Sequence, residues 1–560
     1  MAKIKKLNDK SLVMETAKIK RFIAFVIILS TCICCGNTNA ERNSKSTDEK
    51  KRRESPNILF VISDDQSYPH ASVYGEKWIK TPAFDRVSRE GVLFTNAFAA
   101  SPGCSPSRAA ILTGMNDWQL EDAGTHASEF PLDYTVFPDI LEKMGYKAGY
   151  TGKGWGPGNW KISGRKRNPA GEAYNKKKNN PPTKGISTND YSENFNDFLA
   201  KKKDDEPFCF WFGAHEPHRG FEKGSGLKAG KDIEEVTVPA FLPDDPTVRE
   251  DLLNYALEIE WFDQHLGKIL EKLEETGELE NTIIVVTSDN GMAFPRAKSN
   301  TYEYGIHVPL AIMWGNQIEG GRIVDDPVSL IDIAPTFLEA VSVEGGGDIS
   351  GKYAMEGKSL MNLLMNDNEE AEPYPVRRAA FAARERHSSS RWNNLTYPQR
   401  AIRTEGFLYI RNFKPERWPA GAPQKYESDG TLGPEHGGYH DIDASPTFDF
   451  MLEHRNDSEI RPFFEMAVGK RPAEELYDIK NDPYCLVNLA GEQNFEEELL
   501  EHRRALGSYL MQTNDPRVTG NGDIYETYIR YSFMRKFPKP DWLQNDSLAR
   551  IRIPPNKLKK

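Results

Sequence analysis

The sequence contains few cysteines and no excess of basic residues. Six cysteines occur in 560 residues, and three of them, Cys32, Cys34 and Cys35, lie together near the N-terminus. The remaining three are too few for a disulfide framework, so the globular part must be stabilised by the burial of apolar side chains. Acidic residues outnumber basic ones, 83 against 72, which argues against a general nucleic-acid-binding protein, because such proteins usually present a basic face.

The composition is that of a globular protein. Apolar residues make up 38% of the chain and charged residues 28%, which is enough apolar material for a large core and excludes a disordered or fibrous chain. The length suggests about two to four structural units. The many aromatic residues suit either a packed core or stacking on sugar rings, and composition does not distinguish the two uses.

The N-terminus has the pattern of an export signal. Residues 1–21 carry seven Lys or Arg and two Asp or Glu, and the fourteen residues 22–35 are almost wholly apolar. A membrane-spanning helix needs about 20 residues, whereas a basic segment followed by a short apolar run is typical of a secretory signal peptide. We expect a signal peptide over 1–40, a polar linker over 41–55, and export to the periplasm or the cell surface. Two routes stay open: cleavage after Ala40, or a lipid anchor of bacterial lipoprotein type in the outer membrane, attached to Cys32, Cys34 or Cys35.

The rest of the chain has the pattern of an α/β protein. Over residues 56–385 apolar runs alternate with helical patterns, and the runs at 57–63, 146–151, 208–213 and 282–288 are apolar enough to be central parallel strands. Apolar residues spaced three or four apart over 252–273 predict a helix that ends near Gly277. Residues 386–560 contain shorter strand-like runs and a late helix near 495–511, which predicts a smaller C-terminal α+β subdomain.

Polar side chains follow three of the predicted strands. Asp64 and Asp65 come directly after the first, Asp289 and Asn290 after the fourth, and residues 215–218 (HEPH) after the third. Ligands bind at the carboxyl ends of the strands in an open α/β sheet. Carboxylate and amide oxygens suit Ca²⁺ or Mg²⁺ rather than zinc. The pattern therefore predicts a site for a hard cation at this edge of the sheet.

A second pattern lies at residues 104–108 (CSPSR), directly before an Ala-rich helical run. A helix N-terminus stabilises an anion through its free N–H groups, and Arg108 adds donors suited to an oxyanion. A lone cysteine is most often a small buried side chain, but the residues that follow Cys104 favour a functional role.

These residues resemble the sulfatase signature Cys-x-Pro-x-Arg, in which the cysteine is oxidised to Cα-formylglycine (3-oxoalanine). Further segments are similar to other sulfatase motifs: SPNILFVISDD at 55–65, TGKG at 151–154, AHEPH at 214–218, SDNGMAFP at 288–295 and ELYDIKNDPYCLVNLA at 475–490. The resemblance covers nearly all of the chain after residue 55. It is to the type I formylglycine-dependent sulfatases, and within them to the heparan N-sulfatase branch and similar bacterial polysaccharide sulfatases.

The resemblance implies an alkaline-phosphatase-like fold with a large mixed sheet flanked by helices. It implies a Ca²⁺ held by Asp64, Asp65, Asp289, Asn290 and the modified Cys104. It implies that the sulfate oxygens are neutralised by Arg108, Lys153 and Lys298, and that His215 is the acid beside the leaving group. The implied partners are a formylglycine-generating maturase and a sulfated oligo- or polysaccharide, of algal type such as ulvan or of glycosaminoglycan type such as heparan.

One position departs from the family pattern. The family's Gly-Lys-x-His is Gly-Lys-Gly-Trp here, so Trp155 replaces a histidine, and an indole cannot accept a proton. We expect His126 or His218 to replace the lost imidazole, unless water does so or activity is low. We expect the flat face of Trp155 to stack on a sugar ring beside the sulfate.

Two further functions are weighed against a sulfatase. One is a phosphoester or phosphonate hydrolase of the same superfamily, and the other is a sulfated-glycan-binding protein with weak catalysis. The stretch 161–184 carries eight Lys or Arg and one acidic residue. It is either a solvated insertion or a lip that attracts an anionic polymer.

Overall fold

The computed structural model describes residues 55–342, 355–365 and 378–543. The expected signal peptide, the lipid-anchor cysteines and, apart from Ser55, the expected linker lie outside these ranges. Within them, no helix combines the length and the apolar character that a membrane span requires. Pro56–Lys560 forms one unit, and the boundary predicted at residues 385 and 386 stays a prediction.

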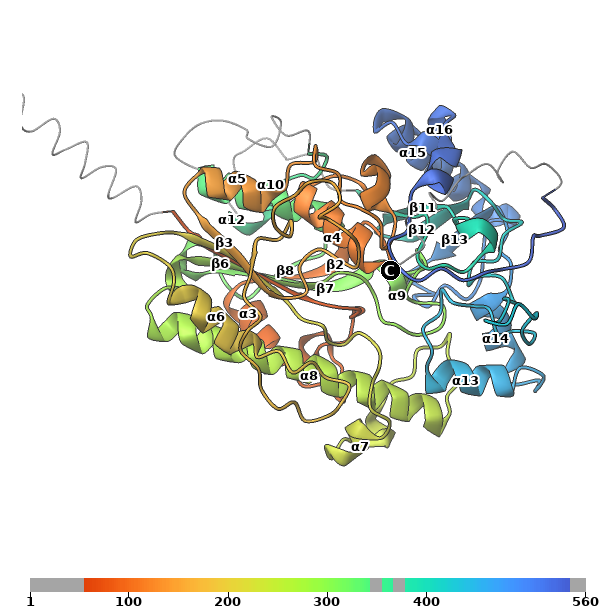
Figure 1. Ribbon diagram of the computed structural model, residues 1–560, viewed down its shortest axis with the longest axis horizontal. Coiled ribbons are helices and arrows are strands. Elements are labelled where there is room, and N and C mark those ends of the chain that lie inside the picture. The colour runs from red at the N-terminus through yellow and green to blue at the C-terminus, as the bar shows by residue number, and fades with distance from the viewer. Residues whose placement is uncertain (1–54, 343–354, 366–377, 544–560) are drawn as a thin grey trace, which may run out of the picture. The chain divides into compact units, whose positions relative to one another are not determined.

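A nine-stranded mixed sheet runs through this unit (Figure 1). Its strand order is β4-β3-β5-β1-β6-β7-β2-β8, and β9 pairs with β2. Strands β3, β5, β1 and β6 are parallel to one another, whereas β7 is antiparallel to both β6 and β2. The strands are β1 (Asn57–Ser63), β2 (Val92–Phe98), β3 (Lys147–Gly152), β4 (Glu172–Ala173), β5 (Phe208–Gly213), β6 (Thr282–Ser288), β7 (His307–Trp314), β8 (Arg322–Val324) and β9 (Val328–Ser329).

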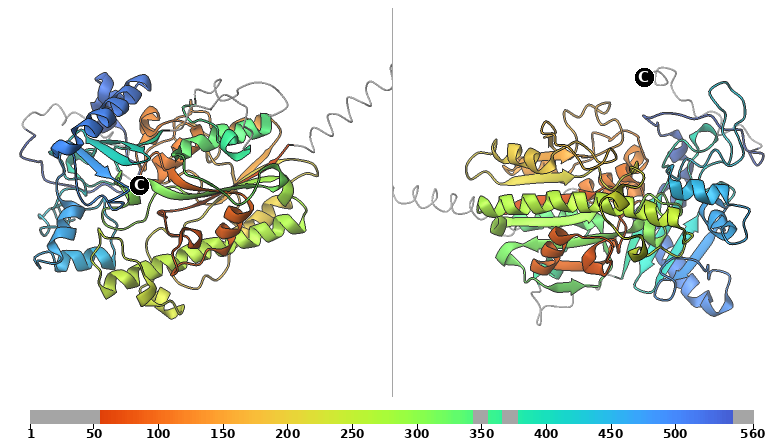
Figure 2. Two further views of the ribbon diagram at one scale, coloured as in Figure 1. Left: turned by 180° about the vertical axis from the view of Figure 1, so that it is seen from behind. Right: turned by 90° about the horizontal axis from the view of Figure 1, so that it is seen from below.

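Helices cover both faces of the sheet, which explains why its central strands are apolar on both sides. Alternate residues of β1 contact different layers, with Phe60 in one core cluster and Leu59 in the other. Helices α4 (Cys104–Thr113), α5 (Phe137–Lys143), α10 (Ile333–Ser342) and α12 (Met361–Met365) lie on the first face, and α3 (Pro82–Glu90), α6 (Tyr191–Leu199) and α8 (Pro246–Glu275) on the second (Figures 1 and 2). The described residues of this region also form the short α-helices α7 (Ser225–Lys228) and α9 (Glu303–Ile306).

The sequence predicted this half of the sheet well. The four apolar runs are β1, β3, β5 and β6, and the long amphipathic pattern is α8, which ends just before Gly277. The antiparallel strand β7 was not predicted from its apolar run. Together these elements confirm the expected large mixed sheet flanked by helices.

A second sheet follows in the chain. Its four antiparallel strands are β10 (Ala379–Arg384), β11 (Gln399–Thr404), β12 (Phe407–Asn412) and β13 (Glu474–Asp478). Helices α13 (Pro446–Glu453) and α14 (Arg461–Val468) lie between β12 and β13 in the chain, and α15 (Glu496–Gln512) and α16 (Pro516–Thr519) follow β13. The Ala383 N–H donates to the Ala100 carbonyl at 2.9 Å, and Arg403 pairs with Glu303 of α9. The second sheet therefore packs against α9 and against the segment that leads into α4.

Candidate active site

The site begins at the carboxyl ends of β1 and β6. These strands pair in parallel register to their last residues, Ser63 and Ser288, so the residues that follow emerge side by side. The Asp65 N–H donates to Asp289 Oδ1 at 3.1 Å. Asp65 has φ 77°, in the left-handed region that non-glycine residues rarely occupy. The tight turn after β1 therefore brings both carboxylates to the same place.

A cluster of possible metal ligands lies at this turn. One ligand atom each from Asp64, Cys104 and Asp289 lie within 4.8 Å of one another, and all three residues are buried. Asn290 Nδ2 donates to Asp65 Oδ1 at 2.7 Å, whereas Asn290 Oδ1 is buried and has no hydrogen-bond partner among the described residues. An unpaired buried amide oxygen is costly unless a ligand uses it. The donor set therefore fits a hard cation such as Ca²⁺.

Cys104 is the first residue of α4, and Gly103 precedes it as the N-cap. Its Sγ lies 3.3 Å from Asp64 Oδ1. Burial, and then the charge of Asp64, raise the pKa of the Cys104 thiol well above its ordinary value. An unmodified Cys104 is therefore a protonated thiol, which is a poor nucleophile.

Three basic side chains each form an ion pair with a different carboxylate of this cluster. Arg108 Nε lies 2.7 Å from Asp289, Lys153 Nζ 2.5 Å from Asp64, and Lys298 Nζ 2.6 Å from Asp65. Burial alone would raise the pKa of Asp64, but Lys153 and the neighbouring cations hold it well below its ordinary value. Arg108 Nη2 is buried and lies 4.0 Å from Asp64 Oδ1, but it donates no hydrogen bond within the described ranges, so this guanidinium has a donor available to an anion.

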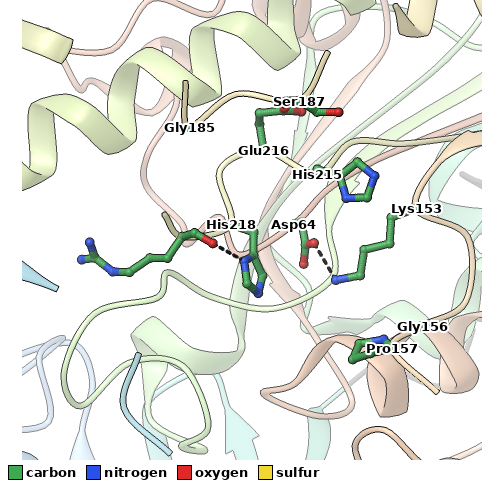
Figure 3. Close-up of a pocket in the computed structure, with 10 residues that line it drawn as sticks. Asp64, Lys153, Gly156, Pro157, Gly185, Ser187, His215, Glu216 and His218 are labelled. Carbon is green, nitrogen blue, oxygen red and sulfur yellow. Dashed lines mark hydrogen bonds and ion pairs between the residues drawn. The ribbon is translucent and has the colours of Figure 1, made fainter. Parts of the chain in front are cut away.

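A cavity of about 530 Å³ opens beside these residues (Figure 3). Its lining includes Asp64, Lys153, His215 and His218, and Figure 3 shows the Lys153 amino group facing the Asp64 carboxylate. His215 is exposed in this cavity, yet the surrounding protein lowers the pKa of its imidazole to about 4, chiefly by desolvation. His215 is therefore neutral near pH 7 in the free protein, and an arriving anion would favour its protonation.

His218 is placed to accept a proton. Its Nδ1 lies 2.6 Å from the Arg219 carbonyl oxygen, which can only accept, so Nδ1 carries the hydrogen in the neutral ring. Its Nε2 lies 3.8 Å from Asp65 Oδ2, and the side chain is 38% exposed. The lone pair of a neutral His218 is therefore on Nε2, beside the carboxylate cluster.

The structure corrects the expectation for Trp155. The side chain is 3% exposed, its Nε1 donates to the Ser105 carbonyl at 2.9 Å, and its ring packs edge-on against Phe130 with centroids 5.1 Å apart. The prediction that its flat face is open to a sugar ring is therefore wrong. Gly156 and Pro157, the next residues in the chain, line the cavity instead.

His126 lies with a histidine that the sequence did not indicate. Its ring packs against His387 with centroids 4.4 Å apart, and the Ala127 N–H donates to Ser105 Oγ at 3.1 Å. His387 Nδ1 lies 3.2 Å from the position that a Cβ on Gly103 would occupy. Burial lowers the pKa of His387 to about 3. Both histidines thus flank the Cys104 loop. No sequence motif marks His387, which follows β10 of the second sheet in the chain.

The arrangement defines a class of protein. A mixed α/β sheet whose strand ends carry a cluster of possible metal ligands, with a cysteine at a helix N-terminus and three basic side chains, is that of an alkaline-phosphatase-like hydrolase of oxyanion esters. The family model described as Sulfatase matches residues 56–343. The chain belongs to the sulfatase family, and it is a sulfuric ester hydrolase.

Known proteins resemble the chain over most of its length. Human (Homo sapiens) N-sulphoglucosamine sulphohydrolase is 26% identical over 84% of this chain and 93% of its own. An ulvan-active sulfatase of Formosa agariphila is 26% identical over 88% of this chain and 82% of its own. A solved structure of a protein in complex with its substrate D-glucosamine-2-N,6-O-disulfate has a TM-score of 0.56, with 21% identity over 82% of this chain and 98% of that one. The fold and the family predicted from the sequence motifs are thereby confirmed.

Proposed function

We propose that this sulfatase removes sulfate groups from a sulfated polysaccharide, of algal type such as ulvan or of glycosaminoglycan type such as heparan. The names of the similar proteins, which act on sulphoglucosamine and on ulvan, support this class of substrate. The basic stretch 161–184 also supports it, because Gly156 and Pro157 before this stretch and Gly185 and Ser187 after it line the cavity. Positive charge at the rim of a cavity raises the local concentration of an anionic polymer.

The observation that carries the proposal is the cluster of oxygen donors at the strand ends, with its unpaired Asn290 oxygen. Ca²⁺ would be held there by Asp64, Asp65, Asp289, Asn290 and Cys104 after its conversion to Cα-formylglycine. When bound, the ion would act as a Lewis acid that activates the hydroxyl nucleophile derived from Cys104.

The remaining site residues have separate roles in the proposal. Arg108, Lys153 and Lys298 bind the sulfate oxygens and compensate the charge that builds up on them during transfer. His215, exposed in the cavity, protonates the leaving oxygen or nitrogen.

The proton acceptor that Trp155 cannot supply is His218 in this proposal. Its Nε2 faces the carboxylate cluster with a free lone pair, because its Nδ1 hydrogen is committed to the Arg219 carbonyl. His126 is less suited, because its Nδ1 is buried without a partner among the described residues and its pKa is lowered by burial and by His387.

The proposal includes export of the protein. A maturase would convert Cys104 before or during export, and the mature chain would reside in the periplasm or be anchored by a lipid at Cys32, Cys34 or Cys35. Mass analysis of the native N-terminus separates lipid attachment from cleavage after Ala40, and a chain that still begins at Met1 would contradict both.

The experiment that tests the activity is sulfate release from a panel of defined sulfated oligosaccharides, with conversion of Cys104 verified by mass. We expect Cys104→Ala to abolish release while the fold is retained, and Cys209→Ala, at a buried cysteine in β5, to keep it. Release near the wild-type rate in Cys104→Ala would overturn the formylglycine assignment. Faster turnover of phosphate esters than of sulfate esters would support a phosphoester hydrolase, and binding of the oligosaccharides without release would support a glycan-binding protein.

A further inference from the structure

Asp443 lies against one of the sulfate-binding cations, although it is far from every sulfatase motif in the sequence. Its Oδ2 is 3.3 Å from Lys298 Nζ, and its side chain is 31% exposed, against 4% for Lys298. Lys298 therefore links the buried Asp65 to a carboxylate that reaches solvent. Among the described residues, Asp443 forms this ion pair and no side-chain hydrogen bond, and its side chain is partly exposed.

The backbone on both sides of Asp443 is firmly held. Two residues before it, buried Asp441 accepts from Arg384 and Arg391, each at 2.7 Å, and from the Ser388 N–H at 2.8 Å. Two residues after it, the Ser445 side chain caps α13 by accepting from the Phe448 N–H. A polar group fixed in this way binds a partner at a small entropic cost.

Positive charge surrounds Asp443 on the site side. Burial opposes ionisation, but Lys298, and then His218 and His387, lower the pKa of Asp443 below its ordinary value. Asp443 is therefore an anion near pH 7. An anion beside a sulfate pocket repels a second negative charge on the substrate and attracts a hydroxyl or ammonium donor.

We propose that Asp443 determines substrate specificity by accepting a hydrogen bond from a hydroxyl or amino group next to the sulfate on the sugar. It thereby disfavours sulfated uronic acids, whose ring carboxylate would meet it. The supporting observation is that the Asp443 carboxylate lies 3.3 Å from Lys298 Nζ, so a sugar whose sulfate binds Lys298 would bring a neighbouring ring substituent close to Asp443. This inference rests on the proposed function and narrows its substrates to sulfated neutral or amino sugars.

The test compares the mature wild-type enzyme with Asp443→Asn and with the control Asp449→Asn, an exposed residue on α13. The probes are p-nitrophenyl sulfate, glucosamine 6-sulfate and glucosamine N-sulfate. Two matched pairs of 2-sulfated sugars complete the set: glucose 2-sulfate with glucuronate 2-sulfate, and galactose 2-sulfate with galacturonate 2-sulfate. We expect wild type to prefer the neutral or amino sugars. We expect Asp443→Asn to lower kcat/KM at least tenfold on the neutral or amino sugar that wild type turns over best, mainly by raising KM. The ratio of kcat/KM between each neutral sugar and its matched uronate should decrease. Turnover of p-nitrophenyl sulfate should stay within twofold of wild type.

Four outcomes would overturn the inference. They are a wild-type preference for a sulfated uronate, an equal loss on p-nitrophenyl sulfate and on the sugars, an unchanged sugar kcat/KM in Asp443→Asn, and turnover of p-nitrophenyl sulfate without turnover of any sugar probe. An equal loss would mean that Asp443 only positions Lys298. If wild type with verified Cys104 conversion releases sulfate from no probe at all, the proposed function itself fails, and this result is distinct from the other four.

Discussion

Arg108, Lys153 and Lys298 each pair with a different carboxylate of the cation site. Three buried carboxylates would repel one another strongly without these partners. A bound divalent cation would take over part of this neutralisation, and the three basic groups would then be available to a sulfate. At the residue scale, each basic side chain of the site could therefore change its partner from a carboxylate to a sulfate oxygen when a metal ion binds the carboxylates.

Trp155 gives a prediction about stability. Trp155→Ala should lower the free energy of unfolding by about 3–5 kcal/mol, because a large buried ring is lost from the core. Trp155→Phe should cost less, since it keeps most of the packing and loses the hydrogen bond to the Ser105 carbonyl. Denaturant unfolding measures both, with p-nitrophenyl sulfate kinetics alongside. A KM on sulfated sugars that rises tenfold in Trp155→Phe, with unchanged stability, would show that the ring contacts substrate after all.

His70 gives a prediction about pH. It is 1% exposed, and burial lowers its pKa from 6.5 to about 3. Between these values the unfolded chain binds a proton that the folded chain does not, so the contribution of His70 to stability is complete above pH 6.5 and falls as the pH falls. Between pH 6 and pH 5, the free energy of unfolding of His70→Phe should fall by about 1 kcal/mol less than that of wild type. Urea unfolding at the two pH values measures this, and an equal loss in both proteins would contradict it.

At the element scale, the end of β3 positions Lys153 through a close backbone approach to β5. The Lys153 N–H donates to the Gly213 carbonyl at 2.7 Å, and a Cβ on Gly213 would lie 1.9 Å from the Lys153 carbonyl oxygen. No side chain fits there, so the backbone contact that positions Lys153 after β3 requires glycine at the end of β5.

Gly213→Ala should therefore displace Lys153, lower stability and reduce turnover at least tenfold. Gly267→Ala is the matched control, because its nearest neighbour would be 3.7 Å away, within α8. Alanine in a helix should stabilise by about 0.5–1 kcal/mol. Thermal unfolding and aryl sulfate kinetics of both variants provide the measurement. Wild-type kinetics in Gly213→Ala would mean that the β3 end can adjust without moving Lys153.

At the scale of the whole molecule, the proposed cation site joins two strands of the central sheet, the α4 helix and the cavity. An ion that binds only the folded state should stabilise the entire unit, by about 2.7 kcal/mol at a concentration 100-fold above its Kd. We expect Ca²⁺ to raise the Tm and a chelator to lower it. Asp289→Asn should abolish this response, and Asp449→Asn should keep it. A Tm that rises with Zn²⁺ but not with Ca²⁺, or an equal rise with Ca²⁺ in Asp289→Asn and wild type, would contradict the assignment of the ligands.

The sequence by itself determined the centre of the fold and the grouping of carboxylates at the strand ends. Strands such as Thr282–Ser288 are apolar on both faces and must lie inside a parallel sheet. The polar residues directly after such strands must then meet at one edge of the sheet. The proximity of Asp64 and Asp289 therefore follows from the sequence pattern alone. The motif around Cys104 marked the helix N-terminus for the same local reason.

Only the tertiary structure decided which other residues surround this cluster. Trp155 directly precedes Gly156, which lines the cavity, and whether its ring points in or out depends on packing against Phe130. His387 and Asp443 reach the site from segments more than 80 residues beyond Lys298 in the chain. Asp441, which accepts from Arg384 and Arg391, holds the segment of Asp443 in place. Such contacts depend on how the second sheet packs against the first, and a pattern of neighbouring residues carries no information about that packing.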